Sequence, residues 1–256
     1  MHKTKAGDFW RSSLEGWGIP QEILNLAPEN PWIHPPAIFD IPEIIDSNIS
    51  HELAKEVAPN TFLDIGCGGG IAAYAAGAKS VIGVDHQLEM LELFRKNGEN
   101  RKVSVQTHLG FWPDVSDKVS SADVVAAHHV VYNVQNIEEF LLRMNEHALR
   151  RVIIEMPQNH PQYGASKLWE HFWQIQRPSS PTPLDLMNIL EEIGIAAKYI
   201  LWEGDIRTSV NLAQEAHFAR IRLCLPSSRE QEVLEFIQSH PAGRKRSLAT
   251  IWWDVK

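Results

Sequence analysis

The pattern of apolar and polar positions divides the chain near residue 60. Before that point, apolar residues occur in short groups between prolines such as Pro20, Pro28 and Pro42, and a proline ends or bends a helix. After it, short apolar runs alternate with longer segments of helical character. We therefore expect an N-terminal helical cap over residues 1–60 and one α/β domain over residues 61–256.

The apolar runs of the second part are the predicted strands. They occupy residues 62–65, 81–85, 103–107, 123–127, 152–155, 198–202 and 248–255. The predicted helices between them cover residues 71–76, 88–96, 137–149, 166–176, 182–193, 212–223 and 228–238. Strands and helices that alternate with short connections indicate a doubly wound, mostly parallel sheet with helices on both faces. A helix around residues 158–180 interrupts the alternation, and we interpret it as an insertion.

Composition narrows the range of functions. The 24 basic and 32 acidic residues give a formal net charge of −8, whereas a protein that binds a nucleic-acid backbone usually carries a basic surface. The basic cluster Arg244-Lys245-Arg246 is interpreted as a solvated turn. The sequence has neither a long apolar run nor a secretory signal, and its two cysteines lie far apart, as is typical of a reducing compartment. We therefore expect a cytoplasmic protein without nucleic-acid or membrane partners.

A glycine-rich loop provides the main functional signal. Asp64–Gly70, with the sequence Asp-Ile-Gly-Cys-Gly-Gly-Gly, follows the first predicted strand and precedes a helix. Its glycines allow a tight turn and a close approach of the backbone to a ligand, toward which the next helix directs free N–H groups. The dinucleotide fingerprint G-x-G-x-x-G would need a glycine in place of Ile71. The spacing here is instead Asp-x-Gly-x-Gly-x-Gly.

Two acidic residues distinguish this loop from one that binds phosphate. Asp64 lies two residues before the first glycine, where a carboxylate would repel a pyrophosphate and attract a positively charged ligand. Asp85 ends the second predicted strand, the position from which an acid binds ribose hydroxyls in sheets of this kind. Together they predict a nucleoside ligand that carries positive charge.

Residues 61–157 resemble the class I S-adenosylmethionine-dependent methyltransferases. Leu63–Gly70 is similar to their first motif, and Val81–Asp85 to their acidic ribose-binding motif. Asp123–Val134 resembles the strand that ends beside the transferred methyl group. The resemblance implies a seven-stranded sheet whose last strand is antiparallel and inserted beside the sixth. It also implies S-adenosyl-L-methionine as cofactor, with its α-ammonium and sulfonium groups as the positive charges.

The cofactor-binding residues that follow from this resemblance lie in the glycine loop and at the ends of the next three strands. They are Asp64, Gly66, Cys67, Gly68, Gly70, Asp85, His86, Met90, Gly110, Phe111, Trp112 and His128. His86 and Met90 are expected to flank the adenine. After the third strand, Gly110-Phe111-Trp112-Pro113 stands where many members have Gly-Asp, so the usual carboxylate for the adenine amino group is missing. Phe111 or Trp112 is expected to stack on the ring instead.

The similarity extends to bacterial small-molecule methyltransferases of ill-defined substrate. The shared stretches are His128–Val134 and Arg177-Pro178 followed by Pro181-Thr182. They cover much of the chain but identify no methyl acceptor.

Candidate catalytic residues follow the fourth strand. His128 and His129 lie at the carboxyl edge of the predicted sheet, where ligands bind in such folds, and imidazole is a suitable base near neutral pH. The resemblance implies that His128 lies along the cofactor and His129 nearer the methyl group. The alternative is that both are hydrogen-bonded packing residues, of which one or neither touches the substrate. The expected substrate pocket comprises Tyr132, Asn133, Glu155, Trp169, His171 and Trp173. The histidines lack the H-x-x-x-H spacing of a zinc helix, so no metal site is predicted.

These patterns favour methyl transfer to oxygen or nitrogen of a small molecule. A nucleic-acid methyltransferase is the first alternative, but base-amino methylation usually comes with an Asn/Asp-Pro-Pro-Tyr/Phe sequence where this chain has Ala127-His128-His129-Val130. The second alternative is a non-catalytic partner subunit that binds S-adenosylmethionine, because its binding loop would look the same.

Overall fold

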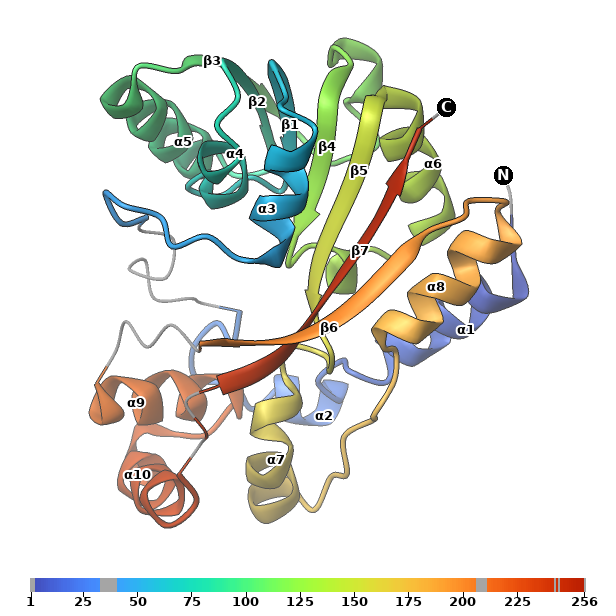
Figure 1. Ribbon diagram of the computed structural model, residues 1–256. Helices are drawn as coiled ribbons and strands as arrows, with labels where there is room; N and C mark the ends of the chain where they lie inside the picture. The colour runs from blue at the N-terminus through green and yellow to red at the C-terminus, as the bar shows by residue number, and fades with distance from the viewer. Residues whose placement is uncertain (1–2, 33–40, 206–210, 242, 244, 256) are drawn as a thin grey trace.

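The sheet has the predicted architecture. The computed structural model describes residues 3–32, 41–205, 211–241, 243 and 245–255. Its seven strands run in the order β3-β2-β1-β4-β5-β7-β6 (Figure 1). They are β1 Thr61–Ile65, β2 Ser80–Asp85, β3 Ser104–Leu109, β4 Ala122–His128, β5 Ala148–Pro157, β6 Lys198–Asp205 and β7 Lys245–Asp254. Strands β1 to β5 pair in parallel, and β7 lies antiparallel between β5 and β6. The predicted doubly wound, mostly parallel seven-stranded sheet is therefore confirmed.

The helices cover both faces of this sheet. They are α1 Lys5–Glu15, α2 Gln21–Leu24, α3 Ile49–Glu56, α4 Ile71–Ala75, α5 Leu88–Arg101, α6 Ile137–His147, α7 Ser166–Trp173, α8 Pro183–Glu192, α9 Leu212–Arg222 and α10 Glu230–Ser239. Alternate strand residues point to opposite faces. Phe62 and Val124 pack with residues of α3, α4 and α5, whereas Leu63 and Val125 pack with residues of α1, α6 and α8.

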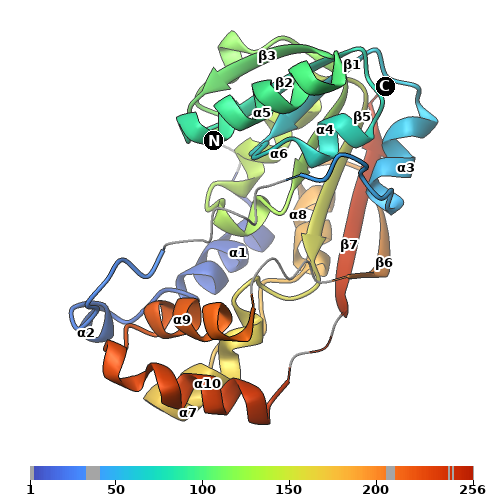
Figure 2. The same ribbon diagram turned by 90° about the vertical axis from the view of Figure 1, so that its left-hand side faces the viewer.

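A separate layer of helices lies beyond the carboxyl ends of β4 and β5. Figures 1 and 2 show α2, α7, α9 and α10 grouped there, away from both faces of the sheet. Their shared core includes Ile23, Trp169, Leu223 and Val233. We call these four helices the helical layer. None of the helices in the described ranges is long and apolar enough to cross a membrane.

The helices of residues 1–60 do not gather into the single cap that the prolines suggested. Helix α1 lies on one face of the sheet, α3 packs against β5 on the other face, and α2 belongs to the helical layer. The reason is that each helix buries a different apolar group: Trp10, Ala54 and Ile23 are each at most 4% exposed. Residues 33–40 of the expected cap lie outside the described residues.

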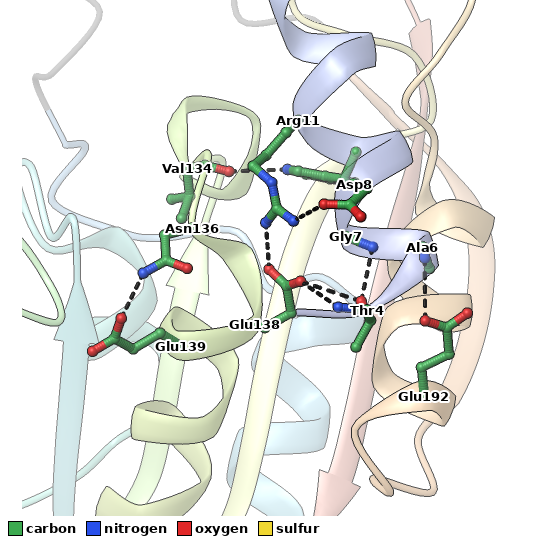
Figure 3. A network of polar contacts seen from close by, with 11 residues as sticks. Thr4, Ala6, Gly7, Asp8, Arg11, Val134, Asn136, Glu138, Glu139 and Glu192 are labelled. Carbon is green, nitrogen blue, oxygen red and sulfur yellow. Dashed lines mark hydrogen bonds and ion pairs between the residues drawn. The ribbon is translucent and has the colours of Figure 1, made fainter. Parts of the chain in front are cut away.

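A buried carboxylate helps to fix helix α1 to the sheet domain. Glu138, at the start of α6, is 1% exposed and accepts hydrogen bonds from the Thr4 backbone N–H at 3.1 Å and from Arg11 Nη1 at 2.8 Å (Figure 3). Burial raises the pKa of Glu138, but its hydrogen bonds and the Arg11 charge outweigh this and lower the pKa overall. This ionised carboxylate therefore contributes to the attachment of α1, together with the buried Trp10, whose Nε1 donates to the Val134 carbonyl.

Candidate functional site

The glycine loop turns sharply between β1 and α4. The backbone N–H groups of Gly66 and Cys67 both donate to the Val84 carbonyl, at 2.8 and 3.1 Å, which ties the loop to β2. Gly66 has φ +67°, and a Cβ there would stand 2.5 Å from Val130 Cγ2. Only glycine satisfies both constraints. Gly70, with φ +91°, ends the loop as the N-cap of α4.

Asp85 holds this loop against the end of β2. Its Oδ2 accepts a hydrogen bond from Gly68 N–H at 3.1 Å, and its Oδ1 accepts one from Gln87 N–H at 3.0 Å. The carboxylate is 8% exposed. The structure therefore brings Gly68 and Asp85 together, at the carboxyl edge where a ribose would have to lie.

Asp64 lies under the loop rather than on its surface. Its side chain is 2% exposed, and its Oδ2 accepts a hydrogen bond from Ala73 N–H at 3.3 Å. Burial, with a further contribution from the nearby Asp85 charge, raises the pKa of Asp64 well above its ordinary value. Asp64 is thus held beneath the loop by its hydrogen bond to α4, and its carboxyl group does not face the surface where a ligand would lie.

Residues 110–112 divide into one exposed and one buried aromatic ring. Phe111 is 62% exposed and stacks on His86, with ring centroids 4.7 Å apart and planes inclined by 17°. Trp112 is 8% exposed and its Nε1 donates to the Phe140 carbonyl, so it belongs to the core. Of the two aromatic rings proposed for adenine stacking, the structure leaves only Phe111 available. Gly110, with φ +147°, donates its N–H to the Asp85 carbonyl.

Cys67 and Met90 are two further residues that the sequence assigned to the cofactor site. Cys67 is 6% exposed, and burial raises the pKa of its thiol well above the ordinary value, so the thiol is protonated and packs as an apolar group. Met90 is half-buried in the first turn of α5.

A second polar group surrounds Glu155, near the end of β5. His128 at the end of β4 is in register with Glu155. His129 follows with φ +62°, and its backbone N–H donates to the Glu155 carbonyl at 2.7 Å. The Glu155 carboxylate lies 3.1 Å from His129 Nε2 and 3.9 Å from His128 Nδ1. The side chains of both predicted histidines therefore lie close to the buried carboxylate of Glu155.

The environments of the two histidines differ. The side chain of His128 is 12% exposed and its ring stacks on His51 of α3, with centroids 5.9 Å apart. Burial lowers the pKa of His128 to about 4, in spite of the opposing charge of Glu155. The side chain of His129 is 37% exposed. His128 is therefore neutral and enclosed, whereas His129 can reach a bound molecule.

Several residues of this group were not predicted from the sequence. Asn48 Nδ2 donates to Glu155 Oε2 at 2.9 Å, and Ser50 also hydrogen-bonds the carboxylate. Arg246 Nη2 lies 3.4 Å from His129 Nε2, so this part of the basic cluster borders the site, while Arg244 lies outside the described residues. Nothing in the local sequence of Asn48 indicates its contact with a strand residue 107 positions away.

Four expected pocket residues are placed elsewhere by their packing. Trp169 is 2% exposed within the helical layer, and Trp173 Nε1 donates to the Leu223 carbonyl at 2.8 Å. His171 packs on Phe236 of α10. Tyr132 is 3% exposed, and its hydroxyl donates to the Pro157 carbonyl. These four side chains stabilise the fold.

The remaining expected pocket residues are Asn133 and Glu155. Asn133 is exposed in the turn after β4, and Glu155 lies in the polar group described above.

Comparison with known proteins places the glycine loop and its strands in a family. Residues 63–149 match the family model described as "Methyltransferase domain". The chain is similar to the ribosomal protein L11 methyltransferase of Tolumonas auensis, with 41% identity over 70 residues. That match covers 26% of this chain and 24% of the relative, so it spans about a quarter of the length of the curated relative.

Solved structures with low sequence identity share the fold. The YcgJ protein from Bacillus subtilis is 14% identical with a TM-score of 0.54, over 81% of this chain and 98% of that one. A putative methyltransferase from Bacillus halodurans is 14% identical with a TM-score of 0.51, over 80% and 97% of the two chains. Residues 63–149 thus match a methyltransferase domain, and the solved structures share the fold of the sheet in which this segment lies.

Proposed function

We propose that this protein transfers a methyl group to an oxygen or nitrogen atom of a small molecule, with His129 as the proton acceptor. The observation that carries the proposal is the pairing of the partly exposed His129 with the buried carboxylate of Glu155, at 3.1 Å. This pair lies at the same carboxyl edge of the sheet as Asp85 and the glycine loop.

The residues present fit the cofactor. Asp85 offers a carboxylate to ribose hydroxyls, and Gly66 and Gly68 have positive φ values that bring the backbone close to a ligand. His86 and Phe111 offer aromatic faces to an adenine ring once they separate from one another. S-adenosylmethionine, when bound, supplies an electrophilic methyl group on a sulfonium.

The chain's own contribution is to position the acceptor and to take its proton. When S-adenosylmethionine is bound, its sulfonium would supply the methyl group and act as leaving group, and His129 would take the proton that the acceptor's heteroatom loses. The neighbouring carboxylate of Glu155 stabilises the imidazolium that results. His128 is enclosed and its pKa is lowered to about 4, which makes it the weaker base.

Two observations support a small acceptor. The net charge of −8 disfavours a nucleic-acid backbone. The helical layer lies beyond the carboxyl ends of β4 and β5 (Figure 2), and a layer in this place favours an acceptor small enough to bind beside it.

The test is methyl transfer from S-adenosylmethionine labelled in the methyl group. The protein is incubated with a panel of phenols, hydroxy acids and amines, and separately with ribosomal proteins and RNA. We expect label in one of the small molecules, and His129→Ala should lower that rate by about 10² to 10⁴-fold. Label in a protein or RNA alone would contradict the small acceptor, and an unchanged rate in the variant would contradict the base.

A further inference from the structure

We propose that Asn48 and Glu155 fix the tautomer of His129, so that Nδ1 is the atom that accepts the proton from the substrate. This inference rests on the proposed function, because it specifies how the base of that reaction is prepared. Glu155 and Asn48 are positioning residues in this account, since they act through His129.

The tautomer follows from the contacts of one ring nitrogen. His129 Nε2 lies 3.1 Å from Glu155 Oε1, and an ionised carboxylate can only accept a hydrogen bond. Nε2 must therefore carry the proton, and in the neutral ring Nδ1 is left with the lone pair. Arg246 Nη2 also contacts Nε2, at the longer distance of 3.4 Å. A guanidinium can only donate, so this contact favours the opposite tautomer. The shorter contact with the charged carboxylate at 3.1 Å outweighs it.

Glu155 is held in its ionised form. Burial would raise the pKa of this carboxyl group, but His128 and His129, together with a hydrogen bond from Ser50, hold it well below the usual range. The amide of Asn48 donates to Oε2, which leaves Oε1 for His129. The two carboxylate oxygens therefore have different partners, and the carboxylate cannot rotate without losing one of them.

A series of hydrogen bonds that begins in β6 and β7 further fixes the position of the Glu155 carboxylate. Trp202 Nε1–H donates to Thr250 Oγ1 at 2.9 Å, and Thr250 Oγ1 lies 2.7 Å from Ser50 Oγ. Trp202 can only donate and Glu155 can only accept. The Thr250 hydroxyl therefore donates to Ser50, and the Ser50 hydroxyl donates to the Glu155 carboxylate. Thr250 and Ser50 are fully buried, so no water competes for these bonds.

The backbone of His129 is also arranged for this contact. Its φ of +62° is uncommon for a residue with a side chain and strains the backbone. The same turn gives the hydrogen bond of 2.7 Å from His129 N–H to the Glu155 carbonyl. His129 is thus attached to Glu155 by both its main chain and its ring.

Asn48 links the start of α3 to this arrangement. Its Oδ1 accepts from His51 N–H at 2.9 Å and caps the helix, while its Nδ2 donates to Glu155. Serine caps a helix as well as asparagine does, but its side chain is too short to reach Glu155. Asn48→Ser therefore removes the contact with Glu155 while it keeps the cap. Asn211 caps α9 with the same pattern and serves as the matched control.

The tautomer is measured directly by nitrogen-15 NMR of the histidine rings in the ligand-free protein at neutral pH. For His129 we expect the Nε2–H form to exceed the Nδ1–H form by about tenfold or more, the preference that one hydrogen bond to a charged group gives. Asn48→Ser and Glu155→Gln should reduce this ratio severalfold, whereas Asn211→Ser should leave it unchanged. An excess of the Nδ1–H form in the parent protein would overturn the proposal, and this outcome does not depend on any variant folding. The proposal would also be overturned if Glu155→Gln folds and leaves the ratio of the Nε2–H to the Nδ1–H form of His129 unchanged.

Kinetics separate this inference from the proposed function. In Asn48→Ser, kcat should fall and its pH profile should shift, while the affinity for S-adenosylhomocysteine stays within about twofold. If the parent protein shows the expected tautomer but neither binds S-adenosylhomocysteine nor transfers methyl groups, the proposed function fails and the geometry of His129 stands. If transfer occurs with the opposite tautomer, only the present inference fails.

Discussion

Acidification should destabilise the ligand-free protein because two histidines are buried in their neutral form. Burial lowers the pKa of His128 to about 4, and burial together with the nearby Arg177 charge lowers the pKa of His160 to about 4, from the ordinary 6.5. His160 is 9% exposed and its ring stacks on Trp17, with centroids 4.2 Å apart. Between pH 6.5 and pH 4 the unfolded chain therefore binds more protons at these positions than the folded protein does.

The magnitude follows from these two pKa values. The stabilising contribution is fully present above pH 6.5 and is lost as the pH falls toward 4. Lowering the pH from about 7.5 to 4.5 should cost about 2.5 kcal/mol for each histidine, or about 5 kcal/mol for both. This is comparable with the whole stability of many domains of this size. Asp64 acts in the opposite direction, because its raised pKa means that the folded protein binds its proton more tightly.

Urea denaturation followed by tryptophan fluorescence, at several pH values across this range, measures the effect. His160→Gln should lower the free energy of unfolding at pH 7.5 by the loss of packing, and it should remove about 2.5 kcal/mol of the pH dependence. Because Asp64 is the same in both proteins, its contribution cancels in the difference. If the difference between parent and variant were the same at pH 7.5 and at pH 4.5, His160 would not be buried in its neutral form and the reasoning would be refuted.

Three further changes test other parts of the structure. Gly66→Ala should destabilise the protein by about 2 kcal/mol or more, because it adds a Cβ at a φ of +67° and only 2.5 Å from Val130 Cγ2. Thermal unfolding measures this loss, and an unchanged midpoint temperature would contradict it. Glu138→Ala should cost about 1 to 3 kcal/mol in urea, because it removes hydrogen bonds to Thr4 and to the charged Arg11, whereas Glu139→Ala, which loses a bond from the Asn136 side chain (Figure 3), should cost less than about 1 kcal/mol; equal losses would contradict the role of Glu138. Asp85→Ala should weaken S-adenosylhomocysteine binding by about tenfold or more in calorimetry, and unchanged affinity would remove this carboxylate from the site.

The sequence predicted what depends on local patterns. Apolar runs located all seven strands, and the spacing of Asp64, the glycines and Asp85 located the cofactor loop. Several boundaries differed, most clearly that of the helix after β4: it was expected to reach Leu149, but Ala148 already pairs with Ala122 of β4. A strand that begins directly after a helix leaves no break in the apolar pattern to mark the boundary.

Contacts between distant segments could not be predicted in this way. The partner of His129 was undetermined because Glu155 and Asn48 come from other elements, and nothing in the local sequence of either indicates the contact. Trp169 and Trp173 were assigned to the pocket from their residue type alone. The same aromatic side chains suit a hydrophobic core, and here they form the core of the helical layer.

Calorimetry of the purified protein with S-adenosylhomocysteine and with NAD, under the same conditions, tests the central claim most directly. The acids at Asp64 and Asp85 and the absence of a dinucleotide fingerprint predict that S-adenosylhomocysteine binds with a dissociation constant in the micromolar range, about −8 kcal/mol, and that NAD binds at least about 100-fold more weakly. NAD binding as tight as that of S-adenosylhomocysteine would contradict the assignment of the loop, and with it the proposed methyl transfer.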